Sequence, residues 1–244
     1  MSMDLSLFVI AVGSFLASFV NAAFATGGIY ILLAASLAVF PVTAAIALQG
    51  PFSLFSLIAR IGLFWSQISW GFVGYFILGC LVGVTIGAIA FAYAADATLL
   101  LLLGFLILGL VWIPIAPGLT LPPKGFAAVG VVHSIFGTLF GIGGVLQPLL
   151  LRTPMLKGQI TGTLAVAMLS LDMMKIFSYS QIGFDYRPYI PHILIAALAA
   201  LFGSWAGKHI SNRISETVFR RVFRWLVTVL AARLIYEGAQ ALAA

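Results

Sequence analysis

The sequence predicts an all-α polytopic membrane protein built from two inverted repeats. Its 244 residues are 63% hydrophobic and only 7% charged, with a mean hydropathy of +1.18. A soluble domain carries roughly a quarter of its residues as charged side chains. Apolar runs of membrane-spanning length recur along the chain, and landmarks of the first half return in the second. Strand-like alternation over about ten residues does not repeat, which argues against an outer-membrane barrel.

Composition also excludes several classes of partner. The net charge of +6 comes from basic residues near helix ends, which the positive-inside rule explains without nucleic acid. A single cysteine, Cys80, excludes a disulfide framework and a thiolate metal cluster, and we expect no cofactor or metal. The N-terminus lacks a basic residue before its apolar run and carries Asp4, so residues 5–26 are interpreted as part of the mature protein.

A duplication of about 115 residues organises the chain. We predict repeat 1 at 1–116, a linker at 117–125 and repeat 2 at 126–244. The expected helices are the apolar runs 5–26, 28–40, 45–65, 70–94, 98–116, 126–142, 144–151, 159–180, 188–207 and 218–238. The matching landmarks are Gly27-Gly28 with Gly143-Gly144, Ser66-Gln67-Ile68 with Ser180-Gln181-Ile182, and Arg60 with Lys175. Internal repeats of this size are typical of secondary transporters.

Charge bias predicts the orientation of the two repeats. The loops 152–157 and 208–221 are basic, whereas their first-half equivalents, 41–44 and 95–97, carry no basic residue. Opposite bias indicates inverted halves, with both termini outside and the linker inside. Inversion requires an odd number of crossings, which is met if each glycine pair turns the chain back into a hairpin that three spans follow. The alternative makes each glycine pair a kink in one crossing, with four spans per repeat and parallel halves.

The stretch FGIGGVLQPLL at 140–150 indicates a broken helix within the membrane. A helix over 144–151 would be only about 12 Å long, too short to cross a bilayer. Its N-terminal N–H groups and dipole favour an anion, and glycine allows a ligand to approach the backbone. Close helix packing is the alternative role for such glycines. Two glycine pairs in matching places favour a binding site that includes Gly27, Gly28, Gly143, Gly144 and the polar Gln147.

These motifs resemble those of the TauE/SafE sulfite exporter family. The resemblance rests on Ala25-Thr26-Gly27-Gly28 and on Gly141-Ile142-Gly143-Gly144 with Pro148, within a duplicated membrane chain. It covers essentially the whole sequence, although Ile29 stands where many members have a third glycine. The resemblance implies a membrane transporter for sulfur-containing anions such as sulfite and organosulfonates.

Charged residues within the expected spans are further candidates for the site. Lys175 and Asp172 are three residues apart and share a helix face. We expect Lys175 and its repeat partner Arg60 to bind the anion. Asp172 and His133 could carry a proton, with a structural ion pair and a packing histidine as alternatives.

Polar residues that could line the same cavity are Gln49, Thr163 and Asn21, although such residues also bond helices together. The sequence contains no hydrolase or ATP-binding motif, so we expect a gradient-driven exporter in the inner (plasma) membrane and not an enzyme. A passive anion channel, or a transporter of another small anion such as a carboxylate, remains the alternative. The expected partners are a small anion and the lipid bilayer, and a homodimer is left open.

Overall fold

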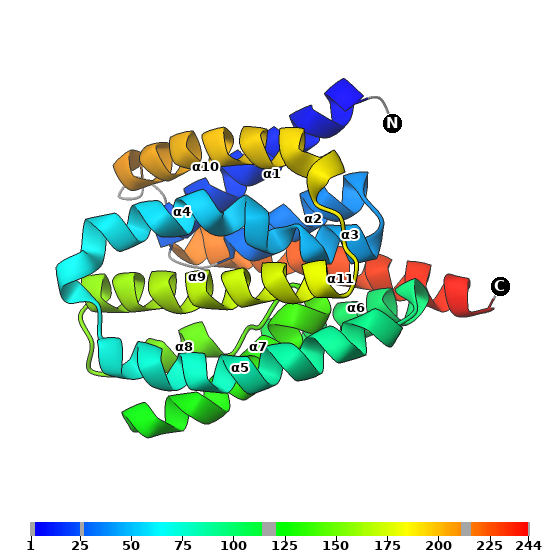
Figure 1. The fold of residues 1–244 in the computed structure, drawn as a ribbon. Helices are drawn as coiled ribbons and strands as arrows, with labels where there is room; N and C mark the ends of the chain where they lie inside the picture. Colours follow the sequence, from blue (N-terminus) through cyan, green and yellow to red (C-terminus); the bar gives the residue numbers. More distant parts are fainter. Residues whose placement is uncertain (1–2, 25–26, 114–120, 211–215, 244) are drawn as a thin grey trace.

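The chain folds entirely into helices. A computed structural model describes residues 3–24, 27–113, 121–210 and 216–243, and every regular element within them is helical (Figure 1). The first half contains α1 (Met3–Phe24), α2 (Gly28–Val39), α3 (Val42–Ala47), α4 (Gln49–Phe64), α5 (Trp70–Tyr93) and α6 (Asp96–Trp112). The second half contains α7 (Phe126–Phe140), α8 (Leu146–Leu150), α9 (Lys157–Gln181), α10 (Ile190–Ile210) and α11 (Glu216–Ala243). Short 3-10 turns lie at Trp65–Gln67, Pro123–Gly125 and Arg187–Tyr189.

Within the described residues, six helical segments are long and apolar enough to cross a bilayer. They are Met3–Phe24, Val42–Gln67, Trp70–Tyr93, Gly158–Gln181, Arg187–Gly207 and Phe223–Ala243. Helices α2 and α6 are apolar but shorter. The predicted all-α polytopic membrane class is confirmed. Positions 117–120 of the expected linker and 211–215 of the basic loop lie outside the described residues.

Two expected helices have different boundaries, and proline and glycine explain both. The run 45–65 begins earlier, at Val42 after Pro41, and divides into α3 and α4 at Leu48. Pro51 has no N–H to donate to the carbonyl four residues before it, which accounts for the interruption. The expected helix 144–151 shortens to the five residues of α8 because Gly141 and Gly144 adopt left-handed backbone angles, with φ of 77° and 68°.

Each half begins with a helical hairpin, as the glycine pairs predict. In the first half the chain turns at Gly27, whose φ is 96°, and α2 returns along α1. Gly13 of α1 lies directly against Ala35 near the end of α2. In the second half α8 returns toward the start of α7, since Leu149 packs in the same buried cluster as Phe126.

Equivalent helices of the two halves pack in equivalent ways. Helix α1 lies along α10 while its counterpart α7 lies along α5, and α4 contacts α9 while α6 contacts α11 (Figure 1). Gly50 lies beside Asp172 and Gly162 beside Phe64, so α4 and α9 run antiparallel. Antiparallel courses of equivalent helices favour inverted repeats. The inverted topology in the bilayer stays a prediction.

The same relation holds for the last helix of each half. Gly104 lies against Ala231, and Gly238 lies against Ala97. Residue numbers therefore increase along α6 in the direction in which they decrease along α11, so this second pair of helices also runs antiparallel.

Glycines allow α7 to pack closely against α5. Gly79, Gly83 and Gly87 recur every fourth residue on one face of α5. A Cβ at Gly79 or Gly83 would collide with a backbone carbonyl of α7, and Gly87 lies against Thr138. Small residues permit such close approach between membrane helices. This contact holds the helix that precedes the second glycine break.

The two ends of the bundle differ in charge. We call "basic end" the one where α4, α6 and α10 finish and α5, α7, α9 and α11 begin. Of the described basic residues it carries Lys124, Arg152, Arg221 and Arg224, whereas Arg187 and Arg233 lie toward the other end; it also carries the tryptophans Trp65, Trp70, Trp112, Trp205 and Trp225. Met3 and Ala243 lie at the opposite end (right side of Figure 1). Tryptophan belts mark membrane interfaces, and the positive-inside rule predicts that the basic end faces the cytoplasm.

Candidate functional site

A cavity of about 290 Å³ lies between the two halves. It is bordered by α1, α2, α4 and α6 from the first half and by α7, α8 and α9 from the second. Nine predicted site residues line it, namely Asn21, Gly27, Arg60, His133, Gly143, Gly144, Gln147, Asp172 and Lys175. The lining therefore brings together residues of both glycine motifs and the two basic residues predicted to bind the anion, Arg60 and Lys175.

The cavity occupies the half of the bundle next to the basic end. Its lining on α9 extends from Lys175 back to Leu164, and on α4 from Ser53 to Arg60. Because α4 and α9 are antiparallel, Arg60 and Leu164 lie at the same level, nearer the basic end. The eleven helical steps from Leu164 to Lys175 correspond to a depth of about 16 Å.

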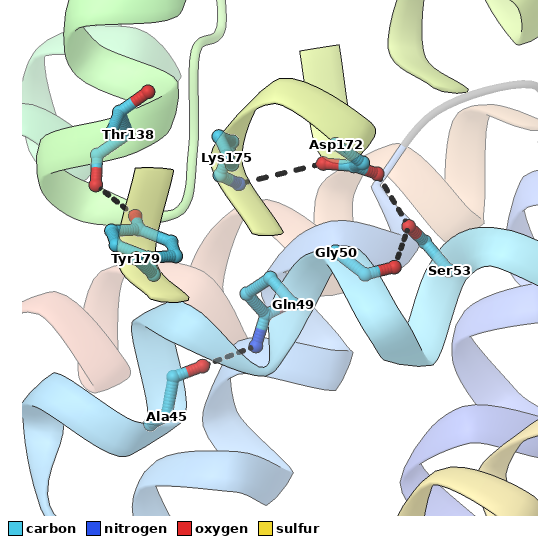
Figure 2. Close-up of polar contacts among 8 residues, drawn as sticks. All are labelled: Ala45, Gln49, Gly50, Ser53, Thr138, Asp172, Lys175 and Tyr179. Atoms are coloured by element: carbon cyan, nitrogen blue, oxygen red, sulfur yellow. Dashed lines mark hydrogen bonds and ion pairs between the residues drawn. The ribbon is translucent and has the colours of Figure 1, made fainter. Parts of the chain in front are cut away.

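Lys175 and Asp172 form an ion pair at the inner end of the cavity. The Lys175 side chain is only 3% exposed, and its Nζ lies 3.5 Å from Asp172 Oδ1 (Figure 2). That separation is at the outer limit of a hydrogen bond. Among the described residues the ammonium has no second hydrogen-bond acceptor, so two of its three N–H groups are available to a ligand in the cavity.

Ser53 is a cavity residue that the sequence analysis missed. Its Oγ lies 2.6 Å from Asp172 Oδ2 and 2.9 Å from the carbonyl oxygen of Gly50 (Figure 2). Ser53 could have been identified from its spacing to Arg60, since residues seven apart lie on one helix face and both line the cavity. A short hydroxyl amid apolar residues gave no reason of its own to select it.

Arg60 supplies the second basic group. Its Nε donates to the carbonyl oxygen of Ser56, 3.3 Å away, and the side chain lines the cavity. Within the described part of the chain no carboxylate forms an ion pair with the guanidinium. The planar donor group therefore has N–H groups to offer to an anion.

His133 closes the break before α8. Its Nδ1 accepts hydrogen bonds from the N–H groups of Val145 and Leu146, at 3.2 and 3.1 Å. Two N–H donors at Nδ1 require that nitrogen to be unprotonated. An imidazolium, with both nitrogens protonated, would lose both hydrogen bonds. This geometry argues for a neutral, structural His133 and against its role as a proton carrier.

Asn21 accepts a backbone hydrogen bond at the first break, as His133 does at the second. Its Oδ1 accepts from the N–H of Gly28, at 3.0 Å, where α2 begins. Side chains therefore accept from the N–H groups of Gly28, Val145 and Leu146, so these three groups are not free to bind an anion. The positive charge of the cavity comes instead from Lys175 and Arg60.

The glycines of both motifs are required by packing as well as by the turns. A Cβ at Gly143 would collide with the His133 imidazole, and a Cβ at Gly144 would collide with Leu110. At Gly27 the Cβ direction meets the ring of Phe223 at 2.9 Å. Protein atoms, and not open space, lie where these side chains would point, so the packing role accounts for the missing Cβ atoms.

Three predicted residues lie outside the cavity lining. Gly28 sits behind Gly27, with its Cα facing α1. Gln49 is 1% exposed and donates from Nε2 to Ala45 O at 3.1 Å, where α3 gives way to α4 (Figure 2). Thr163 is buried and accepts from the N–H of Ser69, 3.0 Å away, which ties α9 to the start of α5. The contacts of Gln49 and Thr163 are those of helix-joining residues.

Beyond Lys175 the bundle is closed. Tyr179, one turn further along α9, is fully buried and donates its hydroxyl to the carbonyl oxygen of Thr138 (Figure 2). Phe140 and Ile142 pack with it in a buried apolar cluster. The route from Lys175 toward the opposite end is therefore filled with side chains.

Among the described residues no cluster of three histidine, cysteine or acidic side chains could hold a metal ion.

Comparison with known proteins identifies the family. A search of curated proteins and a search of solved structures each return no match. The family described as Sulfite exporter TauE/SafE matches residues 10–234, which confirms the resemblance seen in the glycine motifs. A multi-pass helical bundle with its cavity between two glycine-broken hairpins thus belongs to a membrane transporter family, and the chain is a member of the TauE/SafE family.

Proposed function

We propose that the chain is a secondary transporter that exports a small sulfur-containing anion, sulfite or an organosulfonate, across the inner (plasma) membrane. An ion gradient supplies the driving force. The substrate class follows from membership of the TauE/SafE family. The binding residues follow from the cavity.

One observation carries the proposal. Two basic side chains, Arg60 of α4 and Lys175 of α9, line one buried cavity, and only one acidic residue, Asp172, accompanies them in the described lining. Charges within a membrane protein require compensation, since hydrocarbon solvates them poorly. A bound anion supplies it. Inverted repeats place such sites at their interface, near the middle of the membrane.

The cavity gives a substrate access from the basic end. It reaches from Lys175 toward the basic end, whereas the Tyr179 cluster closes the other direction. If the basic end faces the cytoplasm, substrate enters from the cytoplasm in this conformation. Export then requires the side chains packed around Tyr179 to separate and the cavity to close at its end near Arg60.

Transport in proteoliposomes tests the function. The purified chain would be assayed for flux of sulfite, sulfonates, sulfate and carboxylates, with and without a pH gradient. We expect saturable flux of a sulfur-containing anion that runs against its concentration gradient when a pH gradient is imposed. Downhill flux alone would identify the channel alternative, and a preference for carboxylates would overturn the substrate class. Lys175→Met serves as the inactive control.

A further inference from the structure

The charges of the cavity define which anions it can neutralise. Arg60 and Lys175 contribute two positive charges, and an ionised Asp172 contributes one negative charge. The empty cavity then carries a net charge of +1. Since an uncompensated charge in a low-dielectric site is costly, a monoanion is the ligand that balances this state.

A dianion would need one further positive charge, and protonation of Asp172 supplies it. The groups that interact with Asp172 or line the cavity beside it are Lys175, Tyr179, Ser53, Arg60, His133, Tyr30 and Tyr186. Tyrosine hydroxyls are neutral at physiological pH, and His133 is held neutral by Val145 and Leu146. Asp172 is therefore the group whose charge can change.

Ser53 fits both protonation states without moving. When Asp172 is ionised, the Ser53 hydroxyl donates to Oδ2 across 2.6 Å. When Asp172 is protonated at Oδ2, the new O–H donates to Ser53 Oγ, and the serine hydrogen turns to the carbonyl oxygen of Gly50, 2.9 Å away. The same three heavy atoms stay hydrogen-bonded in either state.

We infer that Asp172 adjusts the charge of the cavity to that of its substrate: ionised for a monoanion, and protonated for a dianion, which binds together with one proton. The proton adds to Asp172 Oδ2, and the dianion replaces the carboxylate as the counter-ion of Lys175. This inference rests on the proposed function, because it concerns the same anion site.

Two nearly isosteric probes test whether proton uptake depends on the charge of the bound anion. Sulfate is a dianion and methanesulfonate a monoanion, both tetrahedral about sulfur, and neither changes charge across the neutral pH range. Calorimetric titration of the full purified chain, in two buffers of different ionisation enthalpy, counts the protons taken up with each probe. We expect about one proton with sulfate and none with methanesulfonate. Sulfate affinity should fall as pH rises, because sulfate binds together with a proton.

Variants sharpen the test. Asp172→Asn keeps the size and a hydrogen bond to Ser53 but fixes the cavity charge at +2, so sulfate should bind without proton uptake and independently of pH. Asp96→Asn, at the start of α6 and outside the cavity, should behave as the unmodified chain.

The outcomes separate the inference from the proposed function. Equal proton uptake with both probes, or methanesulfonate binding with no sulfate binding at any pH, would overturn the inference and leave the anion site intact. If neither probe binds, the anion site fails and the inference fails with it. The wild-type titration decides the matter even if Asp172→Asn does not fold.

Discussion

His133 Nδ1 accepts a hydrogen bond from the Leu146 N–H, at 3.1 Å, so an imidazole on one helix completes the start of another. An N–H group of a half-helix would otherwise be unpaired at membrane depth, where it costs free energy comparable to a lost hydrogen bond. The pairing makes the break before α8 a rigid element of the bundle and a wall of the cavity.

Replacing His133 by Asn should preserve most of the stability, whereas replacement by Gln should not. An asparagine oxygen can occupy the place of Nδ1, while the glutamine amide extends to the place of Nε2. Loss of the acceptor leaves two buried N–H groups unpaired, which we expect to lower the free energy of unfolding by about 1–3 kcal/mol. The melting temperatures of the purified variants measure this difference. Equal melting temperatures for the two variants would show that His133 does not support α8 through Nδ1.

Gly143→Ala should destabilise the protein because its Cβ collides with the His133 ring. A double variant, His133→Asn with Gly143→Ala, removes Nε2 and Cε1, the two ring atoms nearest that Cβ, but keeps an atom at the place of Cδ2, so it should recover part of the loss. Gly74→Ala is the control, since nothing lies within 4 Å of its Cβ position. A double-mutant cycle of melting temperatures measures the coupling. Strictly additive effects would mean that the two residues do not compete for this space.

Lys175→Met keeps most of the stem volume and removes the charge. We expect methanesulfonate affinity to fall about ten- to a hundredfold, the range of about 1.5–3 kcal/mol for a hydrogen bond to a charged group. Lys124→Met, on the exposed turn before α7, is the matched control. Titration calorimetry gives the affinity and thermal unfolding the stability. Unchanged affinity with a lower melting temperature would make Lys175 half of a structural ion pair only.

Topology can be read from cysteine labelling in intact cells. In a Cys80→Ala background, Met3→Cys and Leu242→Cys probe the opposite end, and Leu156→Cys probes the basic end; all three positions are exposed. A membrane-impermeant thiol reagent should label the first two and spare the third, since the positive-inside rule places the basic end in the cytoplasm. Labelling at Leu156→Cys, with protection of the other two, would reverse the orientation and the direction proposed for entry.

Much of the fold was predictable because it depends on local properties of the chain. Apolar runs identified the spanning helices within a few residues, and the glycine pairs identified where each hairpin turns. Pro51 was present in the sequence and, as the seventh residue of the expected helix 45–65, indicated a break, yet the apolar run was predicted as one helix and the division into α3 and α4 was missed.

The candidate site was predictable in part. Arg60, Asp172 and Lys175 drew notice because charges are rare in membrane helices, and all three line the cavity. Gln49 and Thr163 are equally polar, but they point at helix junctions and make their hydrogen bonds there. Residue type cannot distinguish a cavity-facing amide from one that ties two helices together.

The sequence by itself determined the class of protein and pointed to Arg60, Asp172 and Lys175, because hydropathy and rarity of charge are properties of single segments; the duplication stays a prediction. Only the tertiary structure decided what each polar group contacts. It showed that Asn21 and His133 occupy the N–H groups once expected to bind the anion, and that Ser53 hydrogen-bonds Asp172 across 119 positions of the chain. The physical reason is that a hydrogen bond depends on distance and direction between atoms of different helices, which are set by how the helices pack together.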